Sequence, residues 1–233
     1  MGRNLDTVAT SSLGLQVALD LLERLRDRLG DDVAALAGER QPVAQQAPQP
    51  ARVRAVQGEE AAERAHIVGA SMGGMIAQVF CAEHADRALS ATVIMSSNNR
   101  RFLPPPGPRQ MLALLKRPPK NATRDDVIAQ SMRLSRIIGS PVYPPEPAVA
   151  RAHAAEYYDR SFYPVGFARQ FAAIMGTGSL VAADRRIAAP TLVLHGSHDK
   201  LMRMSGAEAI AKTVRGAHLT VVDGMAHDLP RPL

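Results

Sequence analysis

The chain has 233 residues, enough for one domain with a sizeable core and a small inserted subdomain. Apolar residues make up 46% of the sequence, which is typical of a globular protein and excludes a disordered one. The formal net charge is +6, but the Arg residues are scattered among Asp and Glu, and no dense basic run alternates with aromatic residues. We therefore expect a solvated, Arg-rich surface and no binding of nucleic acid.

The single cysteine, Cys81, rules out an intrachain disulfide and is compatible with a reducing compartment. It lies in a helical pattern and is expected to be a small buried apolar residue. The N-terminus lacks the apolar core of a signal peptide, and no stretch reaches the roughly 18 apolar residues expected of a membrane helix. These features predict a cytoplasmic protein without a membrane partner.

The first 64 residues show almost no strand pattern. Apolar residues at 12–37 follow a helical period, with charged residues on the opposite face. Residues 40–58 are rich in Pro, Gln and Ala and have no apolar period, which is typical of a linker. We interpret residues 1–64 as an atypical N-terminal helical segment followed by this linker.

Alternation of strands and helices begins after residue 64. Residues 65–69 and 91–95 are short apolar runs typical of buried strands, and residues 73–83 between them indicate a helix. This spacing predicts one βαβ unit of a parallel sheet.

The α/β pattern is interrupted at residues 100–187 and then resumes. The interruption opens with a Pro-rich run and continues through several helical patterns, which predict an inserted helical cap. Two further strands are expected at residues 190–196 and 218–222, with a helix at 205–214 between them. The α/β core is therefore expected in two pieces, residues 65–99 and 188–233.

Residues 69–73, GASMG, fit the pattern G-x-S-x-G and place Ser71 between the first strand and its helix. A nucleophilic serine must project from a very tight strand-to-helix turn, and the flanking glycines allow the backbone to approach closely. The helix that follows directs its N-terminal amides at a developing oxyanion. The alternative is a Gly-rich turn with a structural serine, but the strand before the motif and the helix after it favour the nucleophile.

Residues 65–77, AHIVGASMGGMIA, resemble the nucleophile elbow of α/β-hydrolases, including esterases and methyl-esterase-like enzymes. The resemblance implies an α/β-hydrolase fold with a mostly parallel sheet, and a catalytic triad in the chain order Ser, acid, His. Asp199 matches the acid because it follows a late strand in the segment HGSHDK, and His227 matches the base because it follows the last strand. The separation of 28 residues between them leaves room for one helix and one strand.

Other histidines and acids are weaker candidates for the site. His195 and His198 flank Asp199, and either could line the site. His66 lies inside a strand and is expected to be a packed structural residue. Asp228 is a rival for the acid, but it sits beside the base and is expected to point away. No metal-ligand spacing such as H-E-x-x-H or C-x-x-C occurs, so neither a metal nor another cofactor is expected.

The resemblance also implies two donors for an oxyanion hole. One is the backbone N–H of Met72, the residue after the nucleophile. The other normally comes from a glycine-rich loop that often opens with His-Gly, and no His-Gly pair precedes Ser71. Residues 11–16, SSLGLQ, are the nearest candidate, and in that loop Leu13 would supply the second amide.

Aromatic residues of the helical insertion are candidates for lining the acyl or alcohol pocket. Packing within the cap is an equally good interpretation of the same residues. The four candidates are Tyr157, Tyr158, Phe162 and Tyr163.

The sequence departs from the family at both ends. Little strand pattern precedes the elbow, where a complete member carries several strands, and the last residue, Leu233, follows His227 closely. We therefore expect incomplete N-terminal strands and an incomplete oxyanion hole. We also expect an exposed sheet edge, which invites homo-oligomer formation.

Together these features predict a carboxylic ester hydrolase that acts on a small-molecule ester through Ser71, His227, Asp199 and an acyl-enzyme. Lactone opening, carbon–carbon bond hydrolysis and perhydrolysis on the same triad stay open. The alternative of a different class is a degenerate, non-catalytic module that binds a small ligand or a partner chain.

Overall fold

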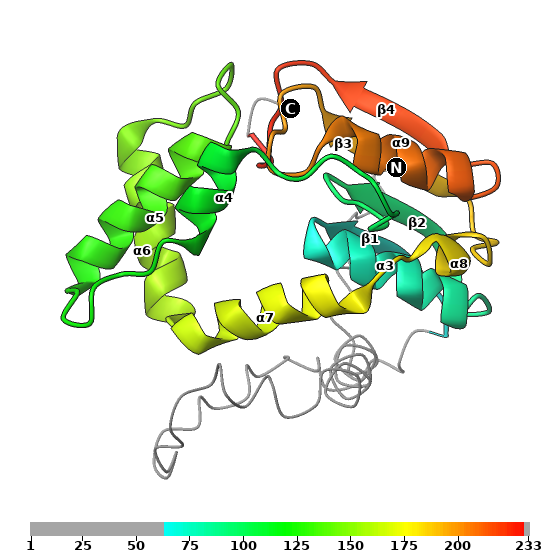
Figure 1. Cartoon of the computed structure of the whole chain (residues 1–233), viewed down its shortest axis with the longest axis horizontal. Helices are drawn as coiled ribbons and strands as arrows, with labels where there is room; N and C mark the ends of the chain where they lie inside the picture. Colours follow the sequence, from blue (N-terminus) through cyan, green and yellow to red (C-terminus); the bar gives the residue numbers. More distant parts are fainter. Residues whose placement is uncertain (1–62, 231–233) are drawn as a thin grey trace, which may run out of the picture.

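The computed structural model describes residues 63–230. The predicted helix at 12–37, the linker at 40–58 and the loop with Leu13 lie outside the described residues. Within the described part, parallel strands form a four-stranded sheet in the order β1-β2-β3-β4 (Figure 1). The strands are β1 (Ala65–Ala70), β2 (Ala88–Ile94), β3 (Thr191–Gly196) and β4 (His218–Val222).

This sheet confirms the predicted parallel α/β core. Helix α3 (Met72–Glu83) joins β1 to β2, and helix α9 (Met204–Thr213) joins β3 to β4. Strand β2 begins earlier than expected, at Ala88, because its pairing with β1 extends past a register shift to the Ala65–Ala88 pair.

The main core lies between the sheet and the helices α3, α8 (Val181–Asp184) and α9. Helix α3 packs on β1 and β2, α9 packs on β3 and β4, and α8 packs on both helices. Val93 and Val193 at the centre of the sheet and Ile210 of α9 are completely buried, and each contributes about 1.5–3 kcal/mol through burial. Cys81 belongs to the same core, and burial raises the pKa of its thiol to about 11, as fits a structural residue.

No helix within residues 63–230 packs closely on the opposite face of the sheet. Val68 on that face of β1 is 65% exposed, and Ile94 and Leu194 beside it are half-buried. His66 lies on this face too, where its exposed ring hydrogen-bonds Ser90 Oγ over 2.8 Å. The prediction that His66 is a packed structural residue is therefore wrong for the described part of the chain, because within residues 63–230 its strand is covered on one side only.

Between β2 and β3 the chain leaves the sheet and forms a helical segment, residues 108–184. Proline occupies the first helical position of α4, α6 and α7. Its missing N–H costs no hydrogen bond there, because the N–H of the first helical residue has no acceptor within the helix. Thr123 and Asp126 form a capping box that starts α5. Figure 1 shows α4, α5 and α6 beside the sheet and α7 returning toward α3. The bounds are α4 (Pro108–Leu115), α5 (Arg124–Ile138), α6 (Pro147–Ser161) and α7 (Pro164–Thr177).

A buried polar pair joins the end of the helical segment to the loop after β2. Asn98 and Asp184 are both completely buried, and Asn98 Nδ2 donates to Asp184 Oδ2 over 2.8 Å. Asp184 Oδ1 has no hydrogen-bond partner among the described residues. Burial raises the pKa of Asp184 to about 6, since removal from water disfavours the charged carboxylate.

We expect Asp184→Asn to flatten the pH dependence of the unfolding free energy between about pH 4 and pH 6. The folded carboxyl keeps its proton up to a pKa of about 6, whereas the unfolded one loses it near pH 4. Wild-type stability therefore falls as the pH rises through this window, by at most roughly 3 kcal/mol. Urea denaturation at a series of pH values measures the slope. Asp86→Asn, at an exposed position, should keep the wild-type slope, and a wild-type slope in Asp184→Asn would count against this assignment.

Candidate active site

Ser71 occupies the tight turn between β1 and α3. Its φ of 55° and ψ of −120° are unfavourable for a residue that carries a Cβ. Two hydrogen bonds hold this turn: Ser71 N donates to Ile94 O over 2.9 Å, and Ser96 Oγ donates to Ser71 O over 2.7 Å. A strained turn of this kind projects the serine hydroxyl beyond the end of the strand, as in a nucleophile elbow.

The close approach of β1 to α3 depends on Gly69. A Cβ at this position would lie 2.1 Å from Gly73 O and 2.8 Å from Gly74 N, both in the first turn of α3. These are backbone atoms, so relief of the clash requires the elbow itself to open.

Gly69→Ala is therefore expected to lower the unfolding free energy by about 3 kcal/mol or more. Gly73→Ala is the matched control, because a Cβ at position 73 meets nothing within 4 Å. Since position 73 is helical, the control should be neutral or stabilising by up to about 1 kcal/mol. Chemical denaturation of both variants measures the difference, and equal losses of stability would refute the steric argument.

The structure brings the side chains of Ser71, Asp199 and His227 into one hydrogen-bonded chain. His227 Nε2 lies 3.0 Å from Ser71 Oγ, and His227 Nδ1 lies 2.7 Å from Asp199 Oδ2. Asp199 is 6% exposed, and its Oδ1 accepts from the backbone N–H groups of Leu201 and Met202, each over 2.8 Å. Since both carboxylate oxygens have partners, the orientation of Asp199 toward His227 is fixed.

The three residues meet because each follows the carboxyl end of a parallel strand, β1, β3 or β4. The loops after β3 and β4 pack directly on each other, with His198 N donating to Met225 O over 2.9 Å. A second backbone hydrogen bond, from His227 N to Ile138 O over 2.9 Å, connects the histidine loop to the end of α5. Both the sheet and the helical segment thus position the imidazole.

Of the two predicted oxyanion donors, the described residues include Met72. It is the first residue of α3, so its backbone N–H belongs to the helix turn that has no intrahelical acceptor. The first turn of α3 carries no acidic side chain, which leaves the positive end of its helix dipole uncompensated. Leu13 lies outside the described residues.

The four aromatic candidates lie around the junction of α6 and α7. Tyr157, Tyr158 and Phe162 line a cavity of about 170 Å³ together with residues of α5, and none of its lining residues belongs to the triad. Tyr163 precedes α7 and is not part of that lining. Contact of these side chains with a substrate stays a prediction.

His195 lies in β3, just before the loop that carries Asp199 (the acid loop). Its side chain is completely buried and does not line an open site. Its Nε2–H donates to Met202 O over 2.8 Å, and burial lowers the pKa of the ring, so His195 is neutral. Asp228 points away from the triad, as expected, since its Oδ1 accepts from Ser140 N over 3.0 Å.

Sequence reasoning missed two serines that support the site. Ser140 Oγ accepts from Ala226 N over 2.8 Å and donates to Asp228, which fixes the histidine loop on both sides of His227. Ser96 holds the elbow through its bond to the Ser71 carbonyl. Neither serine lies in a recognisable motif, and only the folded chain brings Ser140 near residue 227, so no sequence signal could have identified them.

Within residues 63–230, no group of three or more His, Cys, Asp and Glu side chains is placed to hold a metal ion. The helices of the same part of the chain all lack the length and apolar character needed to cross a membrane.

The parallel sheet, the elbow and the order of the strand-end residues are those of an α/β-hydrolase. Residues 50–231 match the sequence profile of the family described as serine aminopeptidase, S33, so the chain belongs to this family of hydrolases.

Individual relatives are more distant. Monoacylglycerol lipase abhd6-B of Xenopus laevis is 24% identical over 172 residues, which cover 70% of this chain and 49% of the relative. The chain thus spans about half the length of the curated relatives it matches.

Solved structures share the fold at low sequence identity. The meta-cleavage product hydrolase CumD of Pseudomonas fluorescens aligns with a TM-score of 0.53 and 20% identity, over 71% of this chain and 58% of that one. The enol-lactonase of Burkholderia xenovorans aligns with a TM-score of 0.52 and 19% identity, over 71% and 59% of the two chains.

Proposed function

We propose that this protein hydrolyses carboxylic esters of small molecules, with Ser71 as nucleophile, His227 as general base and Asp199 as the orienting acid. The observation that carries the proposal is the hydrogen-bonded chain from Ser71 Oγ through the imidazole to the Asp199 carboxylate. Because the carboxylate accepts the Nδ1 proton, the neutral ring presents an unprotonated Nε2 to the hydroxyl.

In the first half-reaction, Ser71 Oγ forms a bond to the ester carbonyl carbon while its proton passes to His227 Nε2. The carbonyl oxygen becomes an oxyanion, to which Met72 N–H donates. The tetrahedral intermediate then collapses: the bond to the alcohol oxygen breaks, and the imidazolium returns the proton to that oxygen. The alcohol leaves and an acyl-Ser71 ester remains.

In the second half-reaction, water attacks the acyl carbon and its proton passes to the same nitrogen. Collapse of this second intermediate releases the carboxylic acid and restores the Ser71 hydroxyl. The cycle consumes one ester and one water and yields one acid and one alcohol, without any redox partner.

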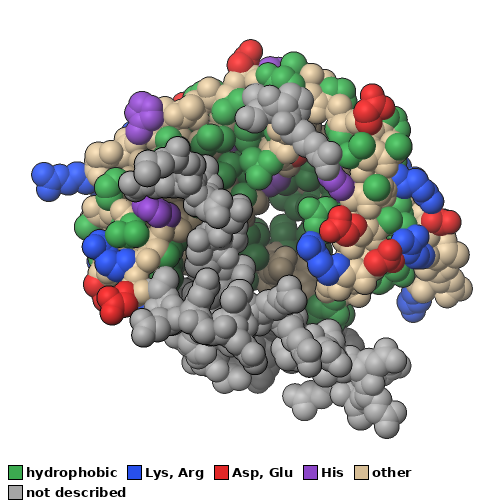
Figure 2. Space-filling model, turned by 180° about the vertical axis from the view of Figure 1, so that it is seen from behind, with side chains coloured by type: hydrophobic (Ala, Val, Ile, Leu, Met, Phe, Trp, Pro, Cys, Tyr) green, Lys and Arg blue, Asp and Glu red, His purple; other side chains and the backbone are tan. Residues whose placement is uncertain are grey.

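Two further observations support an ester with an apolar part. Figure 2 shows a hollow between the sheet and the helical segment, with apolar side chains on its visible walls. The monoacylglycerol lipase named above is by its name an ester hydrolase. The substrate class is thus a small ester whose acyl or alcohol group is largely apolar.

Pre-steady-state hydrolysis of p-nitrophenyl acetate and p-nitrophenyl butyrate tests the proposal. We expect a burst of p-nitrophenol as the enzyme acylates, and an acyl adduct on the peptide that contains Ser71, detected by mass spectrometry after acid quenching. A fluorophosphonate should label the same peptide. Folded protein that shows neither turnover nor labelling would overturn the proposal and favour the non-catalytic binding module.

A further inference from the structure

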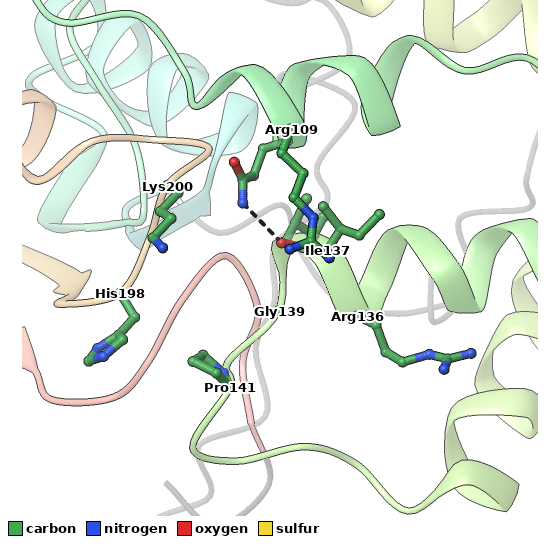
Figure 3. Close-up of a pocket in the computed structure, with 9 residues that line it drawn as sticks. Arg109, Arg136, Ile137, Gly139, Pro141, His198 and Lys200 are labelled. Atoms are coloured by element: carbon green, nitrogen blue, oxygen red, sulfur yellow. Dashed lines mark hydrogen bonds between the residues drawn. The ribbon is translucent and has the colours of Figure 1, made fainter.

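A polar cavity of about 180 Å³ lies next to the proposed active site. It is bounded by the start of α4, the end of α5 and the loop that carries Asp199 (Figure 3). A water molecule occupies about 30 Å³ in the liquid, so this volume accommodates a group such as phosphate or a short carboxylate. The lining consists of Arg109, Gln110, Arg136, Ile137, Ile138, Gly139, Pro141, His198 and Lys200.

The charged side chains of the lining are all basic. Figure 3 shows Arg109 on α4 and Lys200 on the acid loop, on different walls of the cavity, whereas Arg136 extends away from it. Neither Arg109 nor Lys200 forms an ion pair with a carboxylate among residues 63–230. Elsewhere in the helical segment the arginines Arg124 and Arg151 are paired, with Asp159 and Asp125.

Two hydrogen bonds hold the two walls together. Gly107 N donates to Lys200 O over 2.7 Å, and Arg203 Nε donates to Pro105 O over 3.2 Å, so the chain entering α4 is fixed on the acid loop. Arg109 lies in the first turn of α4, directly after this junction. The fold thus places these two cations on different walls of one cavity.

The C-terminal end of α5 opposes the binding of an anion in this cavity, because its carbonyl groups carry partial negative charge. Ile137 O accepts from Gln110 Nε2 over 3.3 Å, and Ile138 O accepts from His227 N. Asp228 lies behind Gly139, where its carboxylate accepts from Ser140. The two carbonyls and Asp228 Oδ1 already accept hydrogen bonds, and no carboxylate among residues 63–230 forms an ion pair with Arg109 or Lys200, so both exposed cations remain open to an external anion.

We propose that this cavity binds the anionic group of a ligand, a phosphate or a carboxylate, through Arg109 and Lys200. Two sources fit this chemistry: a free anion, or an anionic group on the ester substrate itself. The site also adjoins the triad, because Asp199 lies between His198 and Lys200 and the Ile138 carbonyl holds the backbone of His227.

Inorganic phosphate is the probe for binding. Thermal unfolding and calorimetric titration are run in phosphate and in chloride at equal ionic strength. The double variant Arg109→Gln/Lys200→Gln is compared with Arg117→Gln/Lys120→Gln, which removes the same charge from exposed positions outside the lining. We expect phosphate to stabilise the wild type and the control. The affinity of Arg109→Gln/Lys200→Gln for phosphate should fall by at least about tenfold, because losing a hydrogen bond to a charged group typically costs a factor of this size in affinity.

The absence of a phosphate response in the wild type, or equal responses in the two double variants, would overturn the proposal. If Arg109→Gln/Lys200→Gln does not fold, Arg109→Gln alone carries the same test at an exposed helix position. These measurements do not depend on catalysis, so their failure is distinguishable from failure of the proposed esterase activity.

Hydrolysis distinguishes the two sources of the anion and rests on the proposed function. A neutral short p-nitrophenyl ester is compared with mono-p-nitrophenyl glutarate, which carries a free carboxylate. If phosphate competitively inhibits hydrolysis of the anionic ester but not of the neutral one, the cavity binds the carboxylate of the substrate itself. An equal change in kcat for both esters assigns it to a free anion that acts on the neighbouring triad.

Discussion

Ser71→Ala is expected to reduce kcat for p-nitrophenyl butyrate by about 10⁶-fold, the loss typical of a serine nucleophile that acts through an intact triad. The substitution removes the oxygen that lies 3.0 Å from His227 Nε2. It should leave the fold intact, because the Ser71 hydrogen bonds that hold the elbow come from its backbone N and O. The initial rate of p-nitrophenol release measures the effect, and circular dichroism checks the fold.

Ser90→Ala is the matched control for this prediction. It also removes one serine hydroxyl, but this one lies in β2 and hydrogen-bonds His66 away from the triad. The control should keep wild-type kcat and fluorophosphonate labelling. Retention of more than a small fraction of the activity in Ser71→Ala would show that another group attacks the ester.

Asp199→Asn is expected to lower kcat by about 10⁴-fold with little change in KM. The two backbone N–H groups of Leu201 and Met202 require an acceptor, so the Asn oxygen should take the place of Asp199 Oδ1. The amide NH₂ then faces His227 Nδ1 and donates to it. This forces the proton onto Nε2, where the ring can no longer accept the proton of Ser71.

Asp228→Asn tests whether the loss is specific to Asp199. Asp228 is the neighbouring carboxylate and undergoes the same chemical change, but it hydrogen-bonds Ser140 instead of the imidazole. We expect its kcat to stay within about tenfold of wild type, because an amide oxygen still accepts from Ser140. A larger loss in Asp228→Asn than in Asp199→Asn would reverse the assignment of the acid.

The meeting of Ser71, Asp199 and His227 could be predicted from the sequence because each of the three lies in a local pattern. Ser71 lies in a five-residue turn whose geometry demands glycine at position 69, because a Cβ there would clash with the backbone of α3. Asp199 and His227 each follow an apolar strand, and parallel strands bring their carboxyl ends to one edge. Local sequence and strand direction together are enough to place three side chains that are far apart in the chain.

The remaining features depend on contacts that local patterns do not encode. The apolar character of a strand does not say which of its faces is covered, so the exposure of His66 could not be predicted. The cavity lined by Arg109 and Lys200 arises from the backbone hydrogen bond between Gly107 and Lys200. These two residues lie far apart in the sequence, so no local pattern indicates that they meet. The support of the histidine loop by Ser140 has the same origin.

The hydrogen bond from His227 N to Ile138 O has a kinetic consequence. The backbone of His227 is anchored to the end of α5, so a displacement of that helix end would also displace the imidazole. Under the proposed function, proton transfer from Ser71 therefore requires the end of α5 to be in the position described here, so that a bulky ester that pushes α5 outward would react only after the helix returns.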